Sequence, residues 1–164
     1  SGTVNLNTAG SVDTAGNDVT VSGGTLNDDG NGLADTEVLT VNAPGAFVLT
    51  GADTIAGLQG DGGVTLSGAV LTVNNAAGFT YAGVASGTGG LTKGGAGNLT
   101  LTGANTFSGG TTVNAGTLTL NNAGGNALAD TGAVTVTGGT LALSTAETIG
   151  SLAGAGAVNL GANT

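Results

Sequence analysis

The sequence of 164 residues has no cysteine, no histidine and a single basic residue, Lys93. Without cysteine, a secreted protein has no disulfide framework. Without histidine and cysteine, the chain has no Ser-His-Asp or Cys-His catalytic site, and a zinc site loses its usual ligands. Ten acidic residues give a formal net charge of −9. This charge balance excludes nucleic acid and anionic lipid as partners, because both require lysine or arginine for binding.

Aromatic residues and long apolar runs are also scarce. The chain has three phenylalanines and one tyrosine, so leucine, valine, isoleucine and alanine must fill its core. No apolar run approaches the 18 or so residues of a transmembrane helix, and we expect no membrane span in this segment. No secretory signal peptide is visible, so Ser1 would not be the native start of an exported precursor. Charged residues make up only 7% of the chain, which indicates an ordered protein despite its 35 glycines.

The chain contains many short runs in which aliphatic and hydroxyl residues alternate. Three clear examples lie at residues 98–102, 111–114 and 117–120, each ended by turn residues rich in glycine or asparagine. Strand side chains alternate between faces, so Leu99 and Leu101 point to one side and Thr100 and Thr102 to the other. Repeated short strands without any helical segment predict an all-β solenoid. About eight coils, spaced roughly 4.8 Å apart, would stack along its axis.

The same alternation predicts which side chains form the interior of the second half of the chain. The expected interior residues are Leu99, Leu101, Val113, Leu118, Leu120, Val134, Val136, Leu141, Leu143, Ile149, Leu152, Val158 and Leu160. Further strands are expected at residues 3–6, 37–41, 46–50, 70–73 and 79–82, with glycine pairs at the corners between them.

Residues 89–120 carry a family resemblance. They read Gly-Gly-Leu-Thr-Lys-Gly-Gly-Ala-Gly-Asn-Leu-Thr-Leu-Thr-Gly-Ala-Asn-Thr-Phe-Ser-Gly-Gly-Thr-Thr-Val-Asn-Ala-Gly-Thr-Leu-Thr-Leu. This stretch resembles the passenger-associated transport repeat of bacterial autotransporters, and the resemblance is strongest over residues 89–160. It implies a right-handed parallel β-helix and a location outside the cell or on the bacterial cell surface. It identifies a scaffold and no chemistry.

Two internal repeats organise the chain as one solenoid segment, residues 1–164. Residues 19–26 match residues 134–141 at every position but one, 115 residues apart. Residues 53–58 resemble residues 147–152, only 94 residues apart. The first copy therefore carries 21 more residues than the second, which is near the expected length of one coil. We expect an inserted coil or loop at about residues 27–47.

The inserted segment begins with an oxygen-rich sequence, residues 27–37, that is a candidate calcium site. Its spacing resembles the start of an EF-hand loop and, more closely, the calcium loops of thrombospondin type 3 repeats. Asparagine replaces aspartate at the first and fifth positions, which removes two charges. The alternative is a turn whose Asx side chains bond to their own backbone. The candidate ligands are Asn27, Asp29, Asn31, the carbonyl of Leu33, Asp35 and Glu37.

No other motif predicts chemistry. The glycines of residues 94–97 lack the Lys-Ser/Thr of a phosphate loop and are expected to form a corner. Paired acids can cleave glycans, but the only close pairs are Asp28 with Asp29 and Asp53 with Asp61. The Thr-x-Thr sequences are unevenly spaced, so regular threonine ranks of the kind that bind ice are not expected. We therefore predict that the chain is not an enzyme.

The predicted function is a structural or adhesive stalk segment of a secreted bacterial surface protein. Its expected partners are neighbouring coils, copies of itself bound end to end, or a host or matrix glycan. Two alternatives remain open at this point: a subunit of an extracellular filament, and a carbohydrate-active β-helix.

Overall fold

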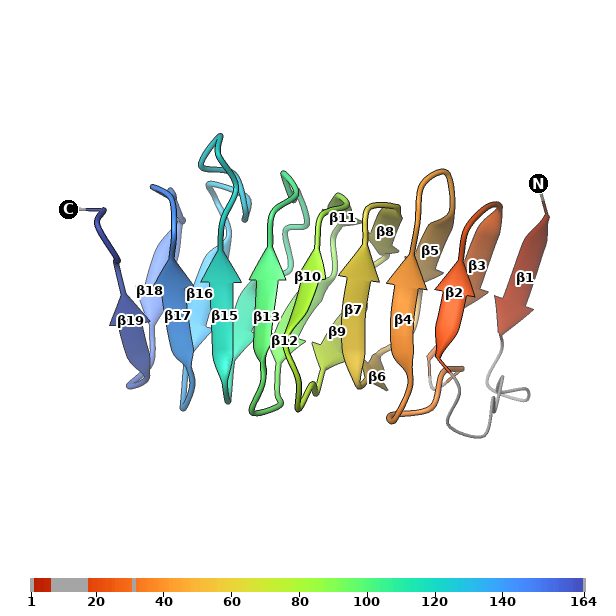
Figure 1. Ribbon diagram of the computed structural model, residues 1–164, viewed down its shortest axis with the longest axis horizontal. Helices are drawn as coiled ribbons and strands as arrows, with labels where there is room; N and C mark the ends of the chain where they lie inside the picture. The colour runs from red at the N-terminus through yellow and green to blue at the C-terminus, as the bar shows by residue number, and fades with distance from the viewer. Residues whose placement is uncertain (1, 7–17, 31, 164) are drawn as a thin grey trace.

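The computed structural model describes residues 2–6, 18–30 and 32–163, and every regular element within them is a β-strand. These strands pair in parallel and wind into a β-solenoid of about seven turns, close to the predicted eight. In Figure 1 the chain rises along the front strands, passes over the top and descends at the back while it advances towards the C-terminus. The coil is therefore right-handed, as the resemblance implies.

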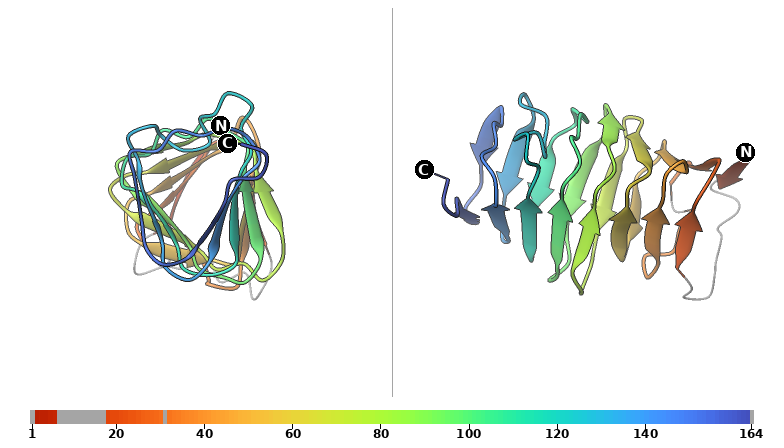
Figure 2. Two further views of the ribbon diagram at one scale, coloured as in Figure 1. Left: turned by 90° about the vertical axis from the view of Figure 1, so that its left-hand side faces the viewer. Right: turned by 45° about the horizontal axis from the view of Figure 1, so that its top comes forward.

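Three parallel sheets form the three sides of the solenoid, which is seen along its axis in Figure 2. The first sheet holds β1 (Thr3–Leu6), β3 (Thr25–Asp28), β5 (Ala46–Leu49), β8 (Gly63–Leu66) and β11 (Ala85–Gly87). The second sheet holds β2 (Val19–Val21), β4 (Val38–Val41), β7 (Gly57–Gly60), β10 (Phe79–Tyr81), β13 (Asn98–Leu101), β15 (Thr117–Leu120), β17 (Thr140–Leu143) and β19 (Ala157–Asn159). The third sheet holds β6 (Asp53–Ile55), β9 (Val70–Val73), β12 (Gly90–Lys93), β14 (Thr111–Val113), β16 (Ala133–Val136) and β18 (Ser151–Ala153).

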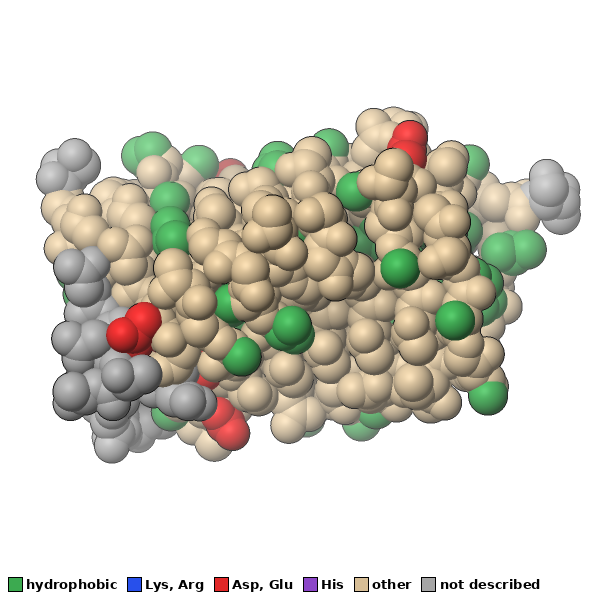
Figure 3. Space-filling model, turned by 180° about the vertical axis from the view of Figure 1, so that it is seen from behind, with side chains coloured by type: hydrophobic (Ala, Val, Ile, Leu, Met, Phe, Trp, Pro, Cys, Tyr) green, Lys and Arg blue, Asp and Glu red, His purple; other side chains and the backbone are tan. Residues whose placement is uncertain are grey.

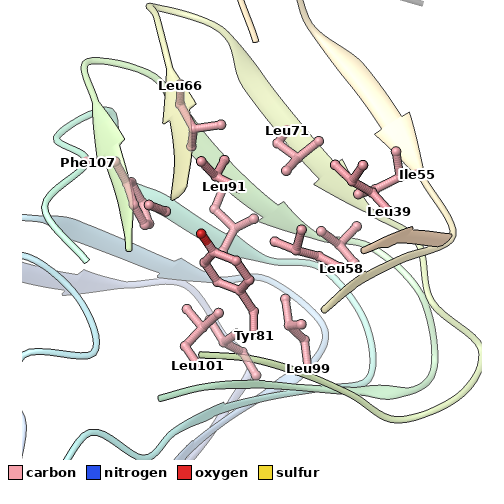
Figure 4. Packing of buried hydrophobic residues seen from close by; sticks show 14 of the residues in the cluster. Leu39, Ile55, Leu58, Leu66, Leu71, Tyr81, Leu91, Leu99, Leu101 and Phe107 are labelled. Carbon is pink, nitrogen blue, oxygen red and sulfur yellow. The ribbon is translucent and has the colours of Figure 1, made fainter. Parts of the chain in front are cut away.

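The core is a narrow column of stacked aliphatic side chains between the three sheets (Figure 4). Most strands bury alternate residues, and parallel pairing places like residues of successive coils above one another. Leu99 pairs with Leu118, which pairs with Leu141. Tyr81 stands among these leucines, and its hydroxyl donates a hydrogen bond to the carbonyl of Gly62 at 2.8 Å. The polar end of this buried ring is thereby satisfied.

The predicted interior is confirmed for its first eight residues, from Leu99 to Leu141, all of which are buried. Leu143 and Ile149 are partly buried against the same core. The prediction is wrong for the last coil, where Leu152, Val158 and Leu160 are exposed. The reason is that β18 and β19 lie at the end of their sheets, and no further coil of this chain covers their inner faces.

Two glycines at equivalent positions of the internal repeat allow the coils to approach closely. Gly60 has a φ of 101° and Gly154 a φ of 103°, a region that L-residues rarely adopt. A Cβ at Gly60 would lie 2.0 Å from the carbonyl oxygen of Val41, and a Cβ at Gly154 would lie 2.0 Å from that of Val136. Both glycines are therefore required by the backbone of the preceding coil.

The segment at residues 27–47 contains both strands and a loop. Leu26 of β3 pairs with Phe47 of β5, and Phe47 pairs with Val64 of β8, so β5 adds one position to the first sheet. Residues 32–37 precede β4 on the side of the third sheet, where the N–H of Leu33 binds Asp53 of β6. Leu33 is buried there, one coil before β6. The loop and the strands β4 and β5 pack on the same core as the rest of the chain.

The outer face of the third sheet carries an unbroken rank of threonines. This rank is one threonine wide, so the expectation that regular Thr-x-Thr ranks are absent stays a prediction. Turns of different length bring these unevenly spaced threonines into register. Five successive strands contribute one outward threonine each, in register with the next. These residues are Thr54, Thr72, Thr92, Thr112 and Thr135.

Candidate functional site

The candidate site is built from two acidic residues that point inwards, Asp28 at the end of β3 and Asp53 at the start of β6. Asp28 is fully buried and Asp53 is 4% exposed. Both occupy positions in otherwise aliphatic columns of the core. Asp28 pairs with Leu49 in the first sheet, and Asp53 pairs with Leu71 in the third. A carboxylate at such a position needs strong partners, because burial of an unpaired charge is very unfavourable.

The carboxylate of Asp28 is only half satisfied by hydrogen bonds. Its Oδ1 accepts the backbone N–H groups of Gly30 at 2.9 Å and Gly32 at 3.2 Å. These two bonds form an Asx-type turn, which is the alternative to a calcium loop. The other oxygen, Oδ2, is buried and accepts no hydrogen bond from an N–H or O–H group.

Asp53 connects the loop to the next coil. Its Oδ2 accepts the N–H of Leu33 at 3.1 Å, and its Oδ1 accepts the N–H of Thr54 at 2.7 Å. Its side chain also lies in hydrogen-bond contact with that of Asp28. Burial, together with the hydrogen bond and negative charge of Asp28, raises the pKa of Asp53 to about 7 against the opposing effect of the two backbone hydrogen bonds. Two adjacent carboxyl groups thus share a buried space that does not accept two negative charges.

The structure places the predicted calcium ligands in different surroundings. The side chains of Asp29 and Asp35 are exposed, whereas Glu37 is buried and accepts the N–H of Ala34 at 3.2 Å. Leu33 contributes its N–H to Asp53, although its carbonyl was the predicted ligand. Within the described residues, no group of three or more acidic side chains is arranged to hold a metal ion.

The two remaining predicted ligands complete this comparison. Asn27 lies within β3, where it pairs with Val48. Asn31 lies outside the described residues, so its predicted role stays a prediction. The two acids that lie in contact are Asp28 and Asp53. The alternation of each strand predicts that both side chains point inwards. Asp28 shares its side of β3 with the buried Leu26, and Asp53 shares its side of β6 with Ile55.

A second carboxylate has the same arrangement in the second repeat copy. Residues 32–36 read Gly-Leu-Ala-Asp-Thr, and residues 127–131 read Ala-Leu-Ala-Asp-Thr. The N–H of Leu33 binds Asp53, 20 residues later, and the N–H of Leu128 binds Glu147, 19 residues later. Each buried leucine is thus held in place by an acid from the next coil. The alignment of Asp53 with Glu147 is visible in the sequence, but the leucine partner is not.

Lys93 occupies an aliphatic column of the third sheet, between Val73 and Val113. It is fully buried, and its ammonium group donates to the carbonyls of Gly95 and Ala115. Burial lowers the pKa of Lys93, because the interior disfavours its charged form. Among the described residues, the hydrogen-bond acceptors of its ammonium group are these two carbonyls, which follow β12 and β14.

Neither of the close acid pairs in the sequence forms a site for glycan cleavage. The carboxyl of Asp28 is buried whereas that of its neighbour Asp29 is exposed. Asp61 is exposed and accepts the N–H of Ala43, whereas the side chain of Asp53 is buried. The pair that does meet, Asp28 with Asp53, is inaccessible to a polymer.

Few charged side chains lie on the face of the solenoid opposite the second sheet (Figure 3). Figure 3, which views the side opposite the second sheet, shows mainly uncharged polar side chains and backbone with a few acidic groups. None of the described segments forms a helix with the length and apolar character needed to cross a membrane.

Comparison with known proteins finds similarity to one family model and to a bacterial autotransporter adhesin. Residues 91–120 match the family model described as Passenger-associated-transport-repeat. Over 98 residues, or 60% of its length, the chain is 53% identical to the protein named Adhesin BmaC autotransporter of Brucella suis biovar 1 (strain 1330). That stretch is 3% of the Brucella protein, so the chain spans a small fraction of its relative. No solved structure matches the chain.

Proposed function

We propose that the chain is a stalk segment of an extracellular bacterial surface protein of the autotransporter type. The observation that carries this proposal is the second sheet, whose parallel strands continue from β2 to β19 along one side of a single hydrophobic core. A rod of stacked coils can hold other parts of a protein away from the cell surface, and this role requires no binding pocket. The match of residues 91–120 to the transport repeat supports export as part of a longer passenger.

An adhesive contribution is the second part of this proposal. The Brucella relative is named an adhesin, and the chain presents hydroxyl groups in register along the third sheet. A host or matrix glycan is the partner that suits an uncharged, hydroxyl-rich face. We propose no enzymatic activity, because the paired carboxylates Asp28 and Asp53 are buried and out of reach of a polymer.

The stalk and the adhesive contribution are tested separately. Small-angle scattering of the purified chain is expected to show a rod, and a compact sphere would contradict the stalk. Binding to immobilised matrix glycans is then measured for the chain and for a Thr72→Lys, Thr112→Lys variant. Binding that is lost in the variant supports the adhesive face. Absence of binding by the unmodified chain would leave a spacer without adhesive function.

A filament subunit is the second candidate, because apolar side chains are exposed at the ends of the sheets. Val4 is 55% exposed on β1, and Leu152 is 51% exposed on β18. Strand edges of this kind recruit further strands, from the same chain or from a copy. Light scattering over a range of concentrations tests this candidate. End-to-end growth of the isolated chain would support it, and a monodisperse monomer at high concentration would contradict it.

A further inference from the structure

We propose that Asp28 and Asp53 together bind a divalent cation, calcium being the ion best suited to them, and that this ion fastens residues 32–37 to the solenoid. The site differs from the one predicted by the alternate positions of residues 27–37. It lies inside the coil, between the end of β3 and the start of β6.

The first argument is the unsatisfied oxygen of Asp28. Its side chain is completely buried, and its Oδ2 has no hydrogen-bond donor. Buried polar atoms in native proteins nearly always have a partner, so an exception indicates a missing ion or water. The carboxyl group of Asp53 is also buried, and its side chain lies in hydrogen-bond contact with that of Asp28.

The second argument is charge balance. The segment carries exposed Asp29 and Asp35 and buried Glu37 in addition to the pair. No basic side chain compensates for them, because Lys93 is the only basic residue of the chain and it donates to the carbonyls of Gly95 and Ala115. A proton would neutralise one of the two buried charges, whereas a divalent cation neutralises both. The surrounding acids also raise the local concentration of cations.

The third argument is the chemistry of the available ligands. Calcium prefers carboxylate and carbonyl oxygens in flexible arrangements of six to eight ligands. Oδ1 of Asp28 is occupied by two backbone N–H groups, whereas its Oδ2 accepts none. Each oxygen of Asp53 accepts one N–H group and retains a second lone pair, so three carboxylate oxygens are available to a metal. The remaining ligands would be backbone carbonyls and water. Extracellular calcium sites commonly bind in the range of about 10⁻⁴ to 10⁻³ M, which suits an incompletely caged ion.

The ion has a defined mechanical consequence. Asp53 already accepts the N–H of Leu33, the buried residue that anchors the loop to the core. An ion bound to both carboxylates would add a second connection, from Asp28 at the end of β3 to Asp53 at the start of β6. Calcium is therefore expected to stabilise the N-terminal coils more than the C-terminal ones.

The experiment compares the melting temperature of the full chain after chelation with its value in calcium chloride up to 5 mM. We expect an increase of several degrees and one site by calorimetric titration. The variants Asp28→Asn and Asp53→Asn are expected to lose both responses, and Asp29→Asn, the adjacent exposed acid, is expected to keep them. Circular dichroism establishes that each variant is folded, and the titration of the unmodified chain decides the matter if the variants do not fold.

Three results would overturn the proposal. The first is an unmodified chain that shows neither heat nor a melting shift in calcium. The second is a calcium response that survives in Asp53→Asn but disappears in Asp29→Asn, which places the ion in the exposed turn. The third is an unmodified chain that ignores calcium and loses stability as pH rises from 5 to 8, with no such loss in Asp53→Asn. That result would assign the pair a shared proton.

Discussion

The backbone N–H of Leu128 lies 2.7 Å from Oε1 of Glu147, an acid from the following coil of the solenoid. The second carboxylate oxygen, Oε2, accepts the N–H of Ala127 at 3.0 Å. These bonds occur on the side of the solenoid where the first sheet has ended and the chain forms the loop of residues 121–132. The side chain of Glu147 therefore replaces the strand that would otherwise pair with Ala127 and Leu128.

Replacement of Glu147 tests this role. Glu147→Ala leaves two backbone N–H groups without their acceptor, and we expect a loss of about 2 kcal/mol in the free energy of unfolding. Glu147→Gln retains one acceptor oxygen and is expected to lose about half as much. The measurement is denaturation in urea, with Asp130→Asn as the control because Asp130 is exposed on the same loop. Equal effects of all three substitutions would show that the carboxylate does not hold the loop.

Strand alternation explains why much of the fold was predictable. Each run of aliphatic and hydroxyl residues specifies one inward and one outward face, and the predicted strand at residues 70–73 agrees with β9. The alternation of β3 also predicts that Asp28 points inwards, because it lies two residues after the buried Leu26. The calcium prediction used residues 27, 29, 31, 33, 35 and 37 of one loop, and so it did not include Asp28. The acids that meet, Asp28 and Asp53, come from two different coils.

Other features depend on contacts that local sequence does not specify. The threonine rank requires the register between strands, and register depends on how many residues each turn absorbs. Thr92 pairs with Thr112, 20 residues later, whereas Thr112 pairs with Thr135, 23 residues later. The exposure of Leu152 has a similar origin. Its alternation is that of a core residue, but burial depends on a neighbouring coil and not on its own strand.

The two faces of β13 are expected to differ sharply in their tolerance of charge. Leu101 is 2% exposed and points into the core, whereas Thr100 lies on the outer face of the same strand. Leu101→Asp buries an unpaired carboxylate, so we expect it to lower stability by several kcal/mol or to prevent folding. Thr100→Asp is expected to change stability by less than about 1 kcal/mol. Thermal melting followed by circular dichroism distinguishes them, and similar melting temperatures for both variants would refute the inward assignment of Leu101.

Gly60 is expected to tolerate no side chain. Alanine there must adopt a positive φ, and its Cβ would collide with the carbonyl of Val41. We expect Gly60→Ala to lower the free energy of unfolding by about 2 kcal/mol or more. Gly63→Ala is the matched control, because Gly63 has open space around its Cβ position and no positive φ. If both variants unfold at the same denaturant concentration, close contact between coils is not what requires glycine.

Lys93 provides a prediction in which the direction of the pH effect is determined by burial. Its folded-state pKa is lower than the ordinary value of 10.5, because the buried site disfavours the ammonium ion. Between that lowered pKa and 10.5, the unfolded chain binds more protons than the folded chain. The stability of the protein must therefore increase as pH rises through this window.

The test is to compare the unmodified chain with Lys93→Met from pH 7 to pH 10. Methionine fills a similar volume in the column between Val73 and Val113, so this variant is expected to fold and to be at least as stable at pH 7. The unmodified chain should gain stability relative to the variant as the pH rises. Burial raises the pKa of Tyr81 above its ordinary value, which lowers the stability of both proteins at still higher pH and cancels in their difference. Lys93→Ala, which leaves a cavity, is expected to lose about 2 kcal/mol or more at every pH. A difference between the unmodified chain and Lys93→Met that stays constant with pH would mean that the pKa of Lys93 in the folded chain is not lowered by burial.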